Sequence, residues 1–115
     1  WPLMEGRLIP DGYLGGMGWL QAAFESRPAV QLHHRWTGYL VAVSAGLLSL
    51  ALWRSHAAAL RTGAIWIASM TAVQIVLGIT TLVHAAPLSL SLLHQAGAIA
   101  LFSAAAIVTW KARRV

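Results

Sequence analysis

Two histidines occupy matching positions near the starts of two strongly apolar segments. His34 lies in VQLHHRWTGY, shortly after Pro28, and His94 lies in SLLHQAGAIA, shortly after Pro87. At about 1.5 Å of rise per helical residue, each imidazole is expected roughly 9 to 10 Å along its helix. Ionisable side chains are rare inside membrane-spanning segments and usually mark a ligand or ion site there. Two imidazoles at equal depth therefore predict a shared partner, which we interpret as a heme iron.

Such a site needs room for the macrocycle as well as two ligands. Small residues follow both histidines at helical spacing: Gly38, Ala42 and Gly46 after His34, and Gly97, Ala98 and Ala105 after His94. These residues could supply that room, but small residues also let helices pack closely without any cofactor. The histidines themselves could instead hydrogen-bond across a helix bundle or reach towards the membrane surface. The residues alone leave these alternatives open.

The polar neighbours of His34 are further candidates for the site. His33 lies about 100° around the helix from His34, so only one of the two can point at a common site. Arg35 could form a charge-assisted pair with a heme propionate, or with a lipid phosphate. Gln31 lies one turn before His34 and could orient its ring or face the loop.

Other polar residues near the apolar segments have simpler interpretations. His56 falls in a basic loop and His84 at the end of the second apolar run, so both are expected to be solvated or interfacial. Gln74 and Gln95 are expected to hydrogen-bond within the helix bundle, because lipid offers no water to a side-chain amide.

The composition indicates a membrane protein. Of the 115 residues, 58% are hydrophobic and only 10% are charged, far fewer than in a typical soluble domain. The absence of cysteine excludes disulfides, thiolate metal sites, iron–sulfur clusters and covalently attached heme. The net charge of +5 is spread along the chain, which argues against a nucleic-acid partner. Because residue 1 is Trp, we expect this chain to be a piece of a longer protein.

Three apolar runs, at about residues 29–53, 63–83 and 88–110, are each long enough to cross a membrane as a helix. Pro28 and Pro87 suit first-turn positions, where a missing amide proton costs nothing. We therefore predict an all-α membrane protein with a three-helix transmembrane region over residues 28–115. Residues 1–27 are expected to form an outer loop, in which a short amphipathic helix could lie on the lipid surface.

The loops predict the orientation. The loop after the first run and the segment after the third are basic, whereas the connection between the second and third runs has no Lys or Arg. By the positive-inside rule, the N-terminal segment faces outwards and the C-terminus faces the cytoplasm or mitochondrial matrix. The bacterial cytoplasmic membrane and the mitochondrial inner membrane both fit this orientation.

Three stretches, WPLMEGRLIPDG, FESRPAVQLHHRWTGYL and QIVLGITTLVHAAPLSLSLLHQAGAIALF, resemble the second half of the heme A synthase family. The resemblance implies an eight-helix parent made of two four-helix halves, each with a pair of ligand histidines. It implies that the first half handles the heme O or heme A substrate, while the second holds a b-type heme that relays electrons. The ligand precedes the motif's arginine, which supports His34 over His33. Where the first half carries a catalytic glutamate, this chain has Gln31, so the reacting centre is not expected here.

The resemblance implies a parent enzyme that oxidises the heme O methyl group to the formyl group of heme A. This chain alone would be inactive and would contribute a heme b with His34 and His94 as axial ligands and Arg35 and Gln31 as further contacts. The N-terminal half or a homologous subunit would complete the bundle. One alternative is a heme-binding electron-carrier membrane subunit without catalysis. Another is a structural subunit whose histidines only hydrogen-bond across helices.

Overall fold

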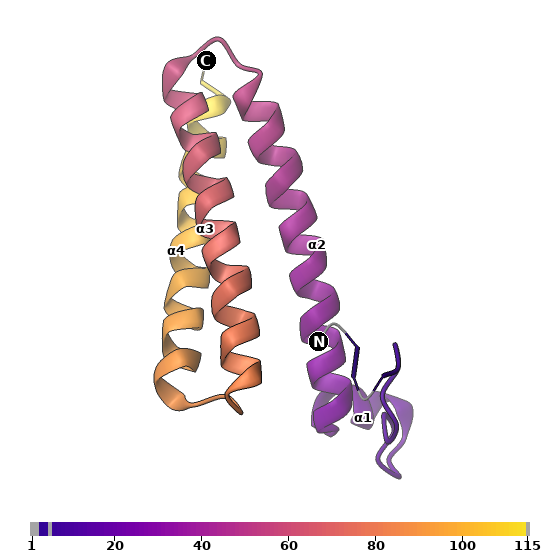
Figure 1. Ribbon diagram of the computed structural model, residues 1–115. Helices are drawn as coiled ribbons and strands as arrows, with labels where there is room; N and C mark the ends of the chain where they lie inside the picture. The colour runs from indigo at the N-terminus through magenta and orange to yellow at the C-terminus, as the bar shows by residue number, and fades with distance from the viewer. Residues whose placement is uncertain (1–2, 5, 115) are drawn as a thin grey trace. The chain divides into compact units, whose positions relative to one another are not determined.

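The computed structural model describes residues 3–4 and 6–114, and four helices dominate that part of the chain (Figure 1). They are α1 (Trp19–Glu25), α2 (Arg27–Trp53), α3 (Ala58–Val83) and α4 (Leu88–Ala112). The chain divides into two units, residues 1–41 and 42–115, with the boundary inside α2. Each unit is described by itself.

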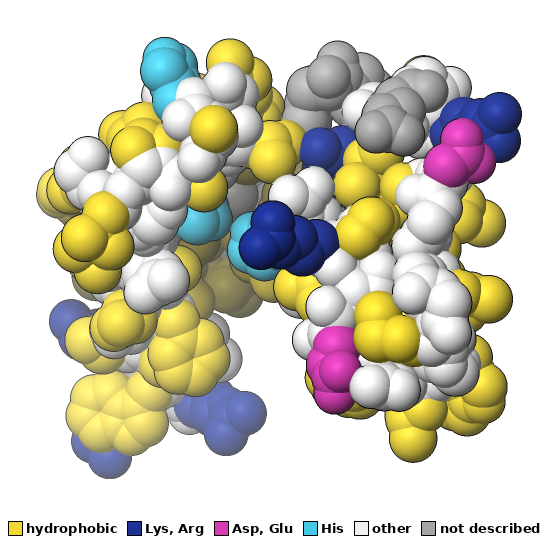
Figure 2. All heavy atoms as spheres, turned by 90° about the horizontal axis from the view of Figure 1, so that it is seen from below, with side chains coloured by type: hydrophobic (Ala, Val, Ile, Leu, Met, Phe, Trp, Pro, Cys, Tyr) yellow, Lys and Arg dark blue, Asp and Glu magenta, His cyan; other side chains and the backbone are white. Residues whose placement is uncertain are grey.

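Three of the four helices, α2, α3 and α4, are long and apolar enough to cross a membrane. Their outward faces carry large apolar side chains, and hydrophobic side chains cover much of the surface seen in Figure 2. Trp66 is 62% exposed and Phe102 is 76% exposed. In water such surfaces would be costly, whereas lipid solvates them. The predicted all-α membrane protein with three spans is thus confirmed.

The helix ends differ slightly from the predicted bounds. α2 begins at Arg27, so Pro28 falls in its first turn as expected. α3 begins at Ala58, five residues before the predicted apolar run, because the helix continues through the polar pair Arg61 and Thr62. α4 begins directly after Pro87, which is its N-cap residue and not a first-turn residue.

In the first unit, the N-terminal segment folds back on itself before α2 begins. Arg7 and Asp11 form an exposed ion pair of 2.8 Å, and Gly12 turns the chain with a φ of +74°. The Ser26 hydroxyl, between α1 and α2, donates to the carbonyl oxygen of Gly12 at 3.5 Å. This contact connects the segment to the start of α2.

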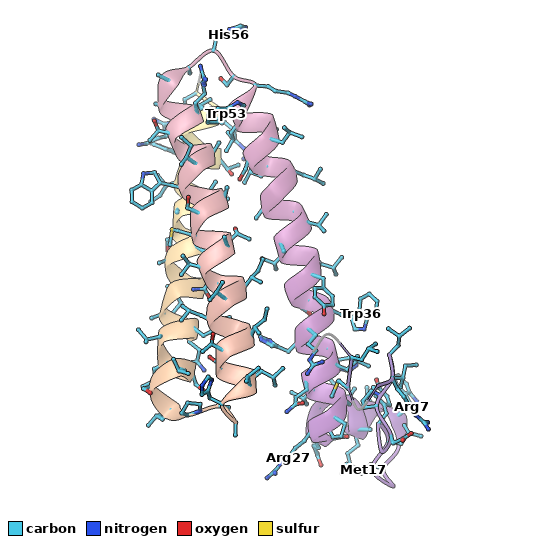
Figure 3. The ribbon with its side chains drawn as sticks, in the orientation of Figure 1. Arg7, Met17, Arg27, Trp36, Trp53 and His56 are labelled. Carbon is cyan, nitrogen blue, oxygen red and sulfur yellow. The ribbon has the colours of Figure 1, made fainter. Side chains whose placement is uncertain are left out.

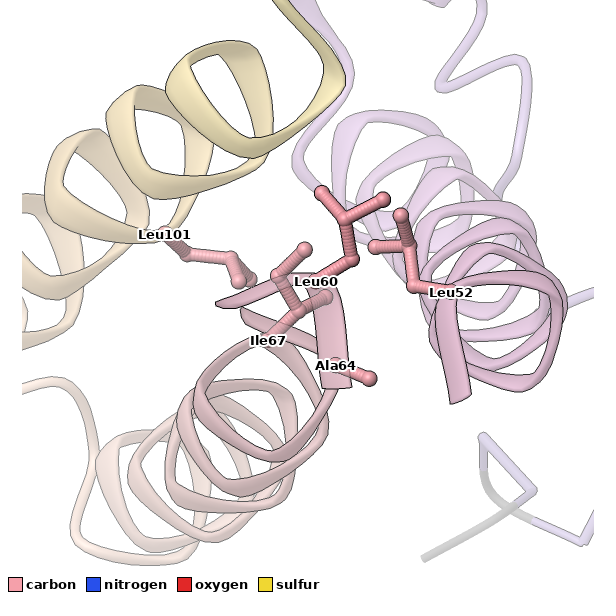
Figure 4. Packing of buried hydrophobic residues seen from close by; sticks show 5 residues of the cluster. All are labelled: Leu52, Leu60, Ala64, Ile67 and Leu101. Atoms are coloured by element: carbon pink, nitrogen blue, oxygen red, sulfur yellow. The ribbon is translucent and has the colours of Figure 1, made fainter. Parts of the chain in front are cut away.

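In the second unit, α3 and α4 form an antiparallel helical hairpin (Figure 1). Its hydrophobic core includes residues from the end of α2 and from both hairpin helices (Figure 4): Leu52, Leu60, Ala64, Ile67 and Leu101. Threonine hydroxyls within α3 donate to the carbonyl oxygens one turn back, Thr71 to Ile67 and Thr81 to Leu77, both at 2.7 Å. These bonds satisfy the hydroxyl groups where lipid cannot.

Candidate functional site

His94 lies on the inner side of the hairpin, half-buried against α3. A Cβ atom built on Gly78 would lie 3.1 Å from its Cε1, 3.5 Å from Nε2 and 3.7 Å from Nδ1. The imidazole therefore lies against the α3 backbone at a position where no side chain stands. Sequence reasoning selected His94 but missed Gly78, since the contact depends on how the two helices align.

One helical turn away, the packing is reversed, and a side chain of α3 lies against a glycine of α4. A Cβ atom on Gly97 would overlap the side-chain amide nitrogen of Gln74. The Gln74 side chain of α3 thus occupies the space beside Gly97, which favours the close-packing alternative for this glycine. Ala105 likewise packs against the hydrophobic core. The close-packing alternative applies to these two small residues of α4.

The small residues of α2 have a different environment. A Cβ atom added at Gly38 or at Gly46 would meet nothing within 4 Å in the described part of the chain. Neither glycine is therefore explained by close packing among the described residues. The prediction that this side of α2 leaves room for a macrocycle stays untested.

Gln74 departs from the expectation of a hydrogen-bonded amide. Its Oε1 atom is buried and has no hydrogen-bond partner within the described residues 3–4 and 6–114. A buried acceptor without a donor costs free energy of roughly 1 to 3 kcal/mol.

The adjacent histidines of α2 have different surroundings. His33 and Tyr13 share a hydrogen bond of 2.9 Å between Nε2 and Oη, and their rings meet edge to face with centroids 5.9 Å apart. This contact joins the N-terminal segment to α2 and uses His33 as a structural residue. His34, on the next position around the helix, is exposed within the first unit.

Gln31 and Arg35 line one pocket of about 330 Å³ at the start of α2, together with Arg27. The three side chains are four residues apart and so share one helix face. A guanidinium nitrogen of Arg35 also donates to the carbonyl oxygen of Leu3 at 3.5 Å. Arg27, which projects from the start of α2 in Figure 3, was missed as a candidate, although its spacing from Gln31 signals a shared face.

The remaining histidines are both exposed, as expected. His56 lies in the turn between α2 and α3, where it points away from the helices (Figure 3). His84 ends α3, and its Nδ1–H donates to the carbonyl oxygen of Thr80 at 2.8 Å. The same carbonyl oxygen also accepts from the backbone N–H of His84 at 3.1 Å, so the ring adds a second bond at the end of the helix.

Arginine–tryptophan contacts follow the ends of α2 and α4. The guanidinium carbon of Arg61 lies 4.9 Å from the ring centroid of Trp53, and that of Arg114 lies 3.7 Å from the ring of Trp110. Such cation–π pairs combine an aromatic ring suited to the lipid interface with a charge suited to the aqueous side.

The two predicted axial ligands belong to different units, His34 to residues 1–41 and His94 to residues 42–115. Their pairing therefore stays a prediction. Among the described residues, no three His, Cys, Asp or Glu side chains gather as a metal site. Axial ligation of a heme requires only two imidazoles, since the porphyrin supplies the four equatorial nitrogens.

Comparison with known proteins gives consistent results. The profile of the COX15-CtaA family, described as cytochrome oxidase assembly protein, matches residues 1–106. The chain is 52% identical over 114 residues to the heme A synthase of Maricaulis maris (strain MCS10). It is 40% identical over 116 residues to that of Caulobacter sp. (strain K31), and 42% identical over 104 residues to that of Paracoccus denitrificans (strain Pd 1222).

These alignments cover 99%, 99% and 90% of this chain, but only 33%, 34% and 27% of the respective relatives. The chain therefore spans about a third of the length of the curated relatives it matches. No solved structure matches it.

Proposed function

Because the chain belongs to the COX15-CtaA family of cytochrome oxidase assembly proteins, the family of the heme A synthases, we propose that it is the heme b-binding part of such an enzyme. The observation that carries this proposal is the family match across residues 1–106, which includes both His34 and His94. The parent protein would oxidise the heme O methyl group to the formyl group of heme A.

An electron-transfer role fits the chemistry of that reaction. Converting a methyl group to a formyl group with an oxygen atom from water releases four electrons and four protons. A reaction of this kind needs a carrier that removes electrons from the reacting centre. A bis-histidine heme supplies one-electron transfer when bound, and an iron with both axial positions filled has none open for substrate. This chain is thus proposed to serve the reaction without containing the reacting centre.

The donor set fits a b-type heme. His34 and His94 each offer one imidazole nitrogen, the ligand type that iron takes in such sites. Arg35 and Arg27 line a pocket with Gln31, and their guanidinium groups suit the carboxylates of heme propionates. The proposed roles are therefore axial ligation by the histidines and propionate binding by Arg35, with Gln31 as a neighbouring polar contact.

The placement in the membrane and the completion of the heme pocket are also part of the proposal. The protein is embedded in lipid with the N-terminal segment outside, and chain beyond this segment, or a homologous subunit, completes the heme pocket and handles the heme O substrate. Two observations support this arrangement. Large apolar side chains of the spans are exposed, and the relatives are about three times as long as this chain.

The test is a reduced-minus-oxidised visible spectrum of the detergent-purified protein at its natural length. We expect a low-spin b-type spectrum in the parent, its loss in both His34→Ala and His94→Ala, and its retention in the control His56→Ala. Unchanged heme content in both ligand variants would contradict the site assignment. Loss of the spectrum in all three variants would indicate general misfolding and would equally remove the support for these two ligands.

A further inference from the structure

Gly78 is a glycine within the C-terminal part of α3 that helix geometry does not explain. It lies inside the helix, five residues before the last helical residue Val83, and its backbone does not adopt a positive φ. A glycine in a helix interior costs roughly 0.5 to 1 kcal/mol relative to alanine. Its place is explained by space, because a side chain there would stand within 3.1 Å of the His94 ring.

We propose that Gly78 is a positioning residue that seats the His94 imidazole against α3 and so sets the orientation of the ligand ring. This inference rests on the proposed function, in which His94 ligates a heme iron. The open side of Gly78 admits the ring edge that carries Cε1 and leaves the two ring nitrogens at 3.5 and 3.7 Å from the Cβ position. The α3 backbone therefore bounds the ring on one side.

A second contact, one helical turn away, fixes how α3 and α4 align along their axes. Gln74 precedes Gly78 by four residues, and Gly97 follows His94 by three, so each pair shares one helix face. The side chain of Gln74 packs onto Gly97, while His94 packs onto Gly78. Sliding one helix along the other would bring both side chains against backbone or Cβ atoms. The reciprocal pair thus fixes the height of His94 relative to α3.

Ligand orientation has measurable consequences. Contacts beyond the ligand set hold a ligating imidazole in one rotation, and they tune metal affinity and electronic structure. A methyl group at residue 78 would meet Cε1 at 3.1 Å, closer than a carbon–carbon contact prefers, so the ring must shift by a few tenths of an ångström. The ring would leave its preferred orientation without losing its ability to ligate.

The experiment compares Gly78→Ala with Gly63→Ala in the protein at its natural length. Gly63→Ala is a matched control, because it adds the same methyl to the same helix, against Val108 and away from His94. The readouts are hemin titration of the apoprotein and the low-spin g values by electron paramagnetic resonance. We expect Gly78→Ala to shift the g values and to raise the hemin dissociation constant roughly 3- to 10-fold. Gly63→Ala should leave the g values unchanged.

A second comparison keeps the inference testable if Gly78→Ala folds poorly. In the His94→Ala background the new methyl meets no ring, so the loss of thermal stability caused by Gly78→Ala should disappear. The loss caused by Gly63→Ala should persist in that background. If the loss of thermal stability caused by Gly78→Ala also persists in that background, the proposal that Gly78 positions the His94 ring is overturned.

The outcomes separate this inference from the proposed function. Unchanged g values and hemin affinity in Gly78→Ala, with heme lost in His94→Ala, would overturn the positioning role of Gly78. The proposed ligation by His94 would not be affected. Heme retained in His94→Ala would overturn the assignment of His94 as a ligand, and with it the proposal that Gly78 positions a ligand ring. Equal g shifts in Gly78→Ala and Gly63→Ala would assign the effect to general helix packing. This result would also overturn the positioning role of Gly78.

Discussion

Val108 of α4 fills the space that a side chain on Gly63 of α3 would need. A Cβ atom on Gly63 would lie 2.7 Å from Cγ1 and 2.9 Å from Cγ2 of Val108, closer than atoms tolerate. Val108 packs against the core that contains Leu60 and Ile67, and Gly63 is buried. The two helices therefore approach closely near the start of α3, by the packing of a large residue onto a glycine that is common between membrane helices.

Gly63→Ala is expected to destabilise the hairpin. The added methyl must displace the branched Val108 side chain, and such overpacking typically costs about 1 to 3 kcal/mol. The measurement is the thermal unfolding midpoint in detergent. Gly46→Ala provides the control, because a Cβ at Gly46 meets nothing within 4 Å among the described residues. An equal loss in both variants would contradict the specific contact.

Gln74→Met is expected to leave stability unchanged or to raise it by up to about 1 kcal/mol. Methionine has nearly the shape of glutamine but lacks the buried oxygen that has no hydrogen-bond donor among the described residues. Thermal unfolding in detergent measures the change, with Gln95→Met on the exposed face of α4 as control. A loss beyond 1 kcal/mol in Gln74→Met alone would show that the amide has a partner in the natural-length protein.

Tyr13→Phe is expected to loosen the N-terminal segment. Removing the hydroxyl breaks its bond to His33, which is worth about 0.5 to 1.5 kcal/mol. Trypsin cleavage after Arg7 should accelerate roughly 2- to 10-fold if the segment opens before cleavage. Heme content should not change, since His34 and not His33 is the proposed ligand.

Tyr39→Phe is the control for that experiment. It removes the same hydroxyl from α2 outside the Tyr13–His33 contact. Equal acceleration in both variants, or none in Tyr13→Phe, would show that the bond does not hold the segment.

The three spans were predictable because their signal is local. A run of some 20 apolar residues has few structures available in lipid other than a helix. The start of α3 was harder to predict, since hydropathy marks the lipid core while the helix extends to Ala58 through the polar Arg61. The helix continues through this first turn whether or not lipid surrounds it, so hydropathy does not mark where the helix begins.

The candidate site was predictable only in part. His34 and His94 stood out because imidazoles are unusual in apolar runs. The contacts of Gly78 and Gly97 could not be read from either helix alone, since they depend on the register between α3 and α4. The small residues after His94 therefore suggested room for a cofactor, where the structure has Gln74 packed against Gly97.

The arginine–tryptophan contacts predict the membrane orientation. Arg61 stacks on Trp53 and Arg114 stacks on Trp110, whereas the turn between α3 and α4 carries no Lys or Arg. Transferring a guanidinium across lipid is costly, so the basic ends stay on the side where the chain was made. We therefore expect the α2–α3 turn inside and the α3–α4 turn outside.

Single cysteines test this orientation, because the chain has none of its own. Ala86→Cys in the α3–α4 turn and His56→Cys in the α2–α3 turn replace exposed residues. A membrane-impermeant maleimide added to sealed right-side-out vesicles should label Ala86→Cys at once and His56→Cys only after permeabilisation. The reverse pattern would invert the orientation. It would also place the starts of α2 and α4, and with them His34 and His94, in the inner half of the bilayer.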